Sequence, residues 1–67
     1  MEILKNGSTL LIEIPTADGE SVVLAKTETS FVTWRKNDQS DTFWGDYYPP
    51  TVEGLKDAIT SLETRAA

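Results

Sequence analysis

The aromatic residues of this chain are confined to one stretch, "SFVTWRKNDQSDTFWGDYY", residues 30–48. It contains Phe31, Trp34, Phe43, Trp44, Tyr47 and Tyr48, together with Arg35 and Lys36. Tryptophan, tyrosine and arginine are enriched at the energetic centres of protein interfaces. Aromatic rings beside basic residues can also stack nucleic-acid bases. The residue types therefore indicate binding chemistry, provided that the core does not need all of the rings.

Catalytic chemistry has few candidates. Asp38 and Asp41 could form an acid–base pair, but they fall in a polar loop where we expect no pocket to shift a pKa. The same loop, "NDQSD", offers oxygen ligands for calcium but lacks the glycine and the distal glutamate of an EF-hand. The chain has no histidine and no cysteine, which excludes a Ser-His-Asp triad, a disulfide and a zinc site with the usual ligands. We therefore predict no enzyme activity, no cofactor and no metal.

The size and charge of the chain indicate which kinds of partner to expect and where the protein resides. The chain has 67 residues, a net charge of −5 and a pI of about 4.4, and we interpret it as one domain, residues 1–67. An acidic surface disfavours nucleic acid, which attracts basic proteins. The sequence contains no apolar run of membrane-spanning length, so we expect no membrane contact. The lack of cysteine fits the reducing cytoplasm, where we expect the protein to reside.

The first half of the chain has the pattern of a β-hairpin. Residues 9–14 alternate in part between apolar and other side chains, and residues 21–27 are rich in β-branched residues. A three-residue loop ending at Gly19 would pair Ile14 with Val22 and Ile12 with Leu24. Asn6-Gly7 is a turn signal, which leaves two readings of residues 1–5: a short edge strand or a loose lead-in.

Residues 30–36 and 42–48 form the next two predicted strands, and two registers compete. A three-residue loop would place Trp34 opposite Trp44. A four-residue loop would place Trp34 opposite Gly45, Val32 opposite Tyr47 and Arg35 opposite Trp44. We favour the second register, because a glycine leaves room for an indole above it.

A C-terminal helix completes the predicted fold. "PP" at residues 49–50 ends the sheet because proline has no amide hydrogen to donate, and Thr51 is a suitable N-cap. The apolar residues of the helix are expected on one stripe: Val52, Leu55, Ala58, Ile59 and Leu62. The fold class is thus α+β, a small antiparallel meander of three to four strands with one C-terminal α-helix packed on one face.

One helix covers one face of a sheet, so the second face is expected to lack a cover. The residues predicted under the helix are Leu10, Ile12, Ile14, Val22, Leu24, Val32, Trp34, Phe43 and Tyr47. The residues predicted on the open face are Leu11, Val23, Ala25, Phe31, Thr33, Arg35, Trp44 and Tyr48, with Glu13 and Asp46. Small monomers seldom expose so much apolar surface, which makes Phe31, Arg35, Trp44 and Tyr48 our candidate partner-binding residues. The simpler alternative is that these rings only stabilise the sheet through cross-strand pairs.

The passage "WGDYYPPTVEGLKDAITSLE", residues 44–63, resembles the strand-to-helix passage of HicB-type antitoxins. In that family a Gly-Asp-Thr turn leads into a helix containing Glu and Ala. Gly45-Asp46 and the helix from Thr51 match this pattern loosely, whereas two prolines and two tyrosines interrupt it. The resemblance covers about a third of the chain and assigns no functional residue.

These observations favour a small acidic, non-catalytic protein-interaction module that binds another protein, or a second copy of itself as a homodimer, through an aromatic open sheet face. Phages and mobile elements encode many proteins of this size and charge that modulate a host protein. The alternative is a nucleic-acid-binding domain that uses aromatic stacking with Arg35 and Lys36. A third class, an acidic mimic of DNA, needs a negative stripe, which the even spread of acids does not provide.

Overall fold

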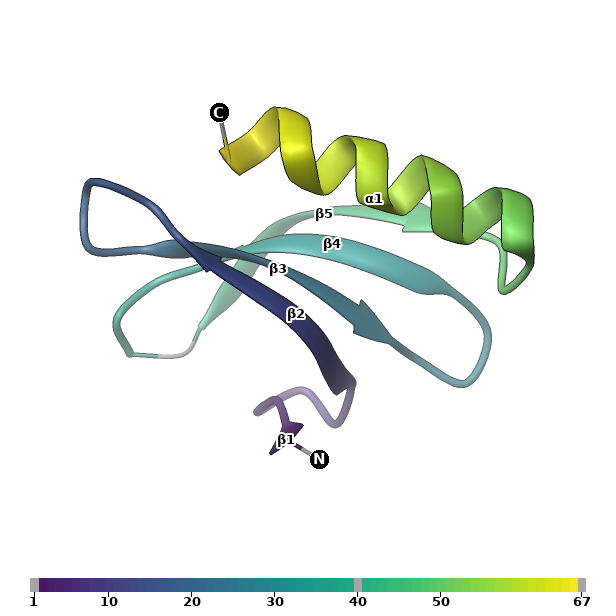
Figure 1. Cartoon of the computed structure of the whole chain (residues 1–67). Coiled ribbons are helices and arrows are strands. Elements are labelled where there is room, and N and C mark those ends of the chain that lie inside the picture. The colour runs from purple at the N-terminus through teal and green to yellow at the C-terminus, as the bar shows by residue number, and fades with distance from the viewer. Residues whose placement is uncertain (1, 40, 67) are drawn as a thin grey trace.

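The computed structural model describes residues 2–39 and 41–66, which form an antiparallel sheet and one helix. The strands are β1 (Glu2–Ile3), β2 (Thr9–Pro15), β3 (Ser21–Lys26), β4 (Phe31–Lys36) and β5 (Thr42–Tyr48), and the helix is α1 (Val52–Ala66). The strands follow one another across the sheet in chain order, and α1 crosses one face (Figure 1). The α+β class is confirmed. The sheet has five strands rather than three or four, because residues 2–3 add a short strand at one edge.

The β2–β3 hairpin has the predicted register at its turn. Gly19 has a φ of 84°, and the Thr16 amide donates to the Glu20 carbonyl at 2.8 Å. Ile14 pairs with Val22 and Ile12 with Leu24, as expected from the three-residue loop. A bulge then shifts the register between residues 10 and 12, and it moves Leu10 to the opposite face from the one predicted.

The β4–β5 hairpin contains both of the competing registers. Val32 pairs with Tyr47, which confirms the favoured register at the end of the hairpin next to the helix. Arg35, however, pairs with Phe43 rather than with Trp44, so the end near the loop follows the other register. The irregularity that joins them lies opposite Trp34 and includes Trp44, whose φ is 58°. A bulge adds one residue to one strand, which is why neither single register describes the hairpin.

The predicted distribution of side chains between the two faces is wrong for β4 and for the part of β5 after the bulge, whereas Phe43 pairs with Arg35 and so lies on the helix-covered face as predicted. Val22 pairs with Arg35 and Leu24 with Thr33, and directly paired residues of an antiparallel sheet point to the same face. The side chains of Phe31, Thr33, Arg35 and Tyr48 therefore share the helix-covered face, whereas Val32, Trp34 and Tyr47 lie on the other. A register error of one residue between β3 and β4 exchanges the faces of β4 and of the β5 residues that pair with it in the predicted register.

The helix begins as predicted but is rotated about its axis relative to the expected stripe. Thr51 caps it, since the Gly54 amide donates to the Thr51 hydroxyl at 3.1 Å. The side facing the sheet contains Gly54, Ala58 and Leu62, whereas Val52 is 68% exposed and Ile59 36% exposed. A Cβ at Gly54 would overlap the backbone carbonyl of Pro49, so this glycine lets the helix start close to the preceding chain.

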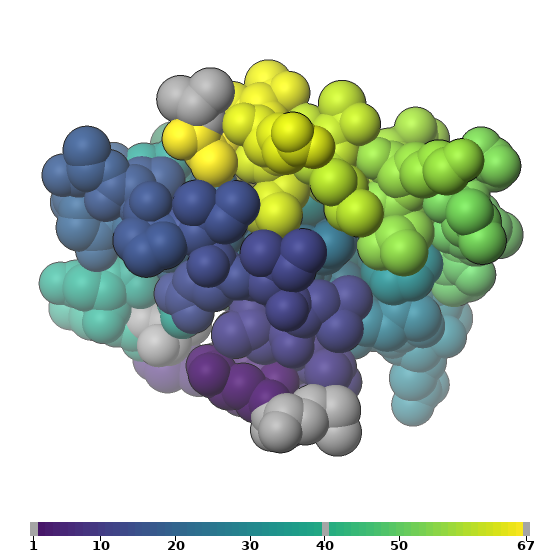
Figure 2. All heavy atoms as spheres, viewed as in Figure 1, coloured from purple at the N-terminus to yellow at the C-terminus, as the bar shows by residue number. Residues whose placement is uncertain are grey.

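The second face has a cover of its own, which corrects the expectation of an open face. Leu4 is 5% exposed and packs with Val23, Ala25, Val32 and Trp34. The N-terminal segment lies on the side of the sheet opposite α1, as Figure 2 shows in purple against the yellow-green helix. Sequence patterns missed this cover because one buried leucine in a short segment produces no periodicity.

Candidate interaction surface around Trp44

Trp44 is the most exposed large apolar residue among those that the structure describes. The residue is 72% exposed, and its ring meets the Phe43 ring edge to face, with the centroids 4.9 Å apart. Its φ of 58° is in the left-handed region, where a bulky residue is an outlier. The left-handed conformation costs about 1–2 kcal/mol for a residue with a Cβ. The backbone conformation of Trp44 thus opposes folding, and its exposed ring offsets little of that cost through burial.

The residue after Trp44 is a glycine that the buried Trp34 indole requires. A Cβ at Gly45 would overlap Nε1 of the Trp34 indole, so Gly45 provides the space that the buried ring occupies. The indole therefore lies over Gly45, as the favoured register predicted. The left-handed residue of the bulge is the preceding residue, Trp44.

A hollow of about 290 Å³ lies beside the Trp44 ring on the helix-covered face. Its lining residues come from three strands and the helix: Val22, Arg35, Trp44 and Arg65. Val22 provides the apolar floor because it is fully buried in the cluster beneath α1. The last turn of the helix forms one wall through Arg65.

Carboxylates hold both arginines of this hollow in place. Arg35 donates from Nε to Glu20 at 2.7 Å and from Nη2 to Asp18. Arg65 donates from Nη2 to Asp46 at 2.6 Å, which ties the end of α1 to β5. The Glu20 and Asp18 carboxylates raise the pKa of Arg35 further above its usual value.

Asp18 is held in its charged form. A hydrogen bond from the Thr16 hydroxyl, followed by the Glu20 amide and then Arg35, lowers the pKa of Asp18 to about 2. Each of these donors favours the ionised carboxylate. The carboxylate at the edge of the hollow is therefore negative throughout the physiological pH range.

The four predicted binding residues share the helix-covered face, but the helix covers only two of them. Phe31 and Tyr48 pair with each other and are half-buried in the cluster beneath α1, so the prediction that this face leaves them uncovered is wrong. Arg35 and Trp44 both line the hollow. Sequence reasoning did not identify Arg65, although its place in the last turn of the predicted helix puts it at this end of the sheet.

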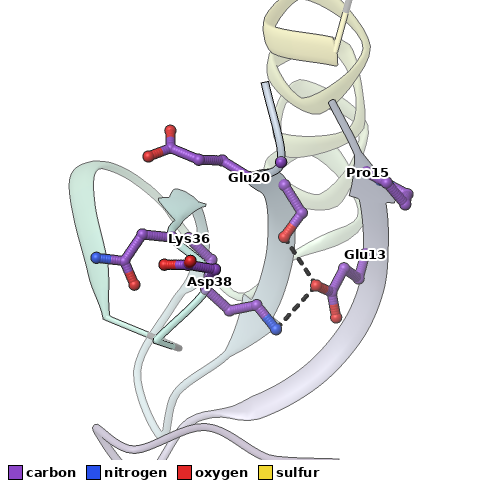
Figure 3. A pocket seen from close by; sticks show the side chains of 8 residues that line it. Glu13, Pro15, Glu20, Lys36 and Asp38 are labelled. Carbon is purple, nitrogen blue, oxygen red and sulfur yellow. Dashed lines mark hydrogen bonds and ion pairs between the residues drawn. The ribbon is translucent and has the colours of Figure 1, made fainter. Parts of the chain in front are cut away.

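A second hollow, of about 240 Å³, lies between the β2–β3 and β4–β5 turns. In it, Glu13 accepts from Lys36 at 2.8 Å and from the Ser21 hydroxyl at 2.7 Å (Figure 3). These two hydrogen bonds, with that of Lys36 the larger influence, lower the pKa of Glu13. A general acid at neutral pH needs a raised carboxyl pKa, so this arrangement has the character of a structural ion pair.

The polar loop between β4 and β5, considered above for calcium, contains Asp38 and Asp41, and part of it lies outside the described residues. Among residues 2–39 and 41–66, no group of three or more metal-ligating side chains comes together. No helix in the described part of the chain is both long and apolar enough to span a bilayer.

Comparisons with known proteins find no matching family model, no matching curated protein and no matching solved structure.

Proposed function

We propose that this chain is a non-catalytic protein-interaction module that binds its partner through the surface around Trp44. The observation that carries the proposal is the combination of a 72% exposed indole with a φ of 58° in the same residue. Strained residues persist where the surrounding structure determines them, and they cluster at binding sites. A large exposed ring next to an arginine is also the composition of an interface hot spot.

The charges around the surface favour a protein partner over nucleic acid. Arg35 carries two carboxylate partners, and Lys36 is 9% exposed and paired with Glu13. The basic residues that would contact phosphates are therefore already neutralised. With a net charge of −5, the domain would also meet repulsion from a nucleic-acid backbone.

The proposed role is the modulation of another protein in the cytoplasm, of the kind that phages and mobile elements exert on a host protein. Arg35 and Arg65 in the first hollow and Glu13 and Lys36 in the second are each held in ion pairs, which supports binding over catalysis.

Affinity capture with two matched variants tests the proposal. The wild-type domain, Trp44→Asn and Tyr47→Asn are used as baits in a lysate of the native host. Tyr47 is the control because it lies on the same strand and is 64% exposed, but on the opposite face of the sheet. We expect a partner that Tyr47→Asn retains and Trp44→Asn loses. Sedimentation of the pure protein shows whether that partner is a second copy. Capture that is equal for all three baits, without Trp44-dependent self-association, contradicts the proposal.

A further inference from the structure

The Trp44 indole offers a surface that suits a cation. Apart from its edge contact with Phe43, most of the residue is in water, and it borders the hollow that contains Val22. Tryptophan is the side chain whose ring face attracts arginine and lysine most strongly. A long basic side chain also has an aliphatic stem that can cover apolar surface while its charged end stays at the rim.

The carboxylates bound to the two lining arginines add to the attraction. Asp18 and Glu20 pair with Arg35, and Asp46 pairs with Arg65, so these five groups together have a net charge of −1 (−3 + 2). The Asp18 and Asp46 side chains are each 55% exposed, whereas those of Arg35 and Arg65 are 21% and 22% exposed. An approaching partner therefore meets carboxylate oxygens before it meets guanidinium groups.

The carbonyl end of α1 reinforces this field. Arg65 lies in the last turn of the helix and lines the hollow, so the negative end of the helix dipole is close to it. Over longer distances the whole domain has a net charge of −5. Within the described part of the chain, six carboxylates take part in no ion pair: Glu2, Glu28, Asp38, Glu53, Asp57 and Glu63.

We infer that the partner is a positively charged protein that places an arginine or lysine side chain on the Trp44 indole, attracted by the exposed carboxylates of Asp18 and Asp46. This inference rests on the proposed function and specifies its partner. A second copy of the chain fits less well, because two molecules that each carry −5 repel one another. An anionic ligand also fits less well, because Arg35 and Arg65 already hold carboxylates.

Titration with model peptides, followed by NMR of the two indole N–H signals, tests this inference. The probes are an arginine–glycine repeat peptide and a glutamate–glycine repeat peptide of the same length. Because Trp34 is 8% exposed and on the other face, its signal is an internal control. We expect the arginine peptide to shift the Trp44 signal selectively, and the binding to weaken as salt is added.

Three variants sharpen the outcome. Loss of a cation–π contact predicts that Trp44→Asn weakens binding of the arginine peptide about 3- to 30-fold. Asp46→Asn should weaken it by a smaller factor, and Tyr47→Asn should leave it unchanged. A peptide that only follows the overall negative charge would bind Trp44→Asn and Tyr47→Asn equally, and this result would overturn the inference. Preference for the glutamate peptide would overturn it as well.

Failure of this inference is distinguishable from failure of the proposed function. Suppose that a host protein depends on Trp44 for capture, yet the complex is insensitive to salt and the arginine peptide does not compete. That result would support the proposed interaction module and contradict the inference that its partner is basic.

Discussion

The two tryptophans of the β4–β5 hairpin lie in opposite surroundings. Trp34 is 8% exposed, has a glycine beneath its ring and is covered by Leu4. Trp44 is 72% exposed, has a left-handed backbone and borders a hollow with charged residues at its rim. Both environments meet at one bulge: Gly45 leaves room for the buried Trp34 ring, and the residue before it, Trp44, has the left-handed backbone and the exposed ring. Similar residues in one hairpin can therefore serve the core or the surface, depending on the backbone next to them.

Removal of the buried ring should have the largest effect on stability. Trp34→Ala is expected to lower the free energy of unfolding by about 3–5 kcal/mol, because it opens a cavity between Leu4, Val23 and Val32. Urea denaturation followed by circular dichroism measures this change. A loss below about 1 kcal/mol would show that the Trp34 side is not the sealed core described above.

Gly45→Ala tests whether glycine is required at position 45 for the close approach of the Trp34 indole. The new Cβ would overlap the Trp34 indole, and overpacking of this kind costs about 1–3 kcal/mol. The matched control is the double variant Gly45→Ala with Trp34→Phe, whose smaller ring leaves space for the methyl group. If the double variant is no more stable than the sum of the two single changes predicts, steric contact with the indole is not the reason for Gly45.

Acid should lower the stability of the fold, because it protonates the Asp18 and Glu13 carboxylates that form ion pairs with Arg35 and Lys36. The folded-state pKa of Asp18 is lowered from 3.8 to about 2, and that of Glu13 lies below 4.5. A group with a depressed folded pKa stabilises the fold above its unfolded pKa and loses that contribution as the pH falls through the folded value. Stability should therefore decrease below a pH of about 4.5 and continue to fall towards a pH of about 2. Glu13→Gln and Asp18→Asn should each flatten the pH dependence of the urea midpoint, and unchanged curves for both would contradict this assignment.

Trp44→Asn should have the smallest effect on stability. Asparagine tolerates the left-handed conformation, which offsets the loss of an aromatic contact that contributes about 0.5–1.5 kcal/mol. We expect the free energy of unfolding to change by less than about 1 kcal/mol while partner binding is lost. A decrease comparable to that of Trp34→Ala would mean that Trp44 serves the fold rather than an interface.

Local sequence determined the elements of this protein and several of their contacts. The three-residue turn at Gly19, the cap at Thr51 and the space over Gly45 each depend on the chemistry of residues that are neighbours in the chain or across one hairpin. These features were predictable because the conformational preferences of glycine, threonine and proline act over a few residues.

Beyond the β2–β3 hairpin, tertiary structure decided which side of the sheet most residues face and what covers it. The β3–β4 register and the bulge at Trp44 depend on contacts among β3, β4, β5 and α1, and a change of one residue in either exchanges the two faces. The hollow also joins Val22, Trp44 and Arg65, which are far apart in the chain. Side-chain types are local information, whereas a shared face results from strand pairing, which no short stretch of sequence specifies.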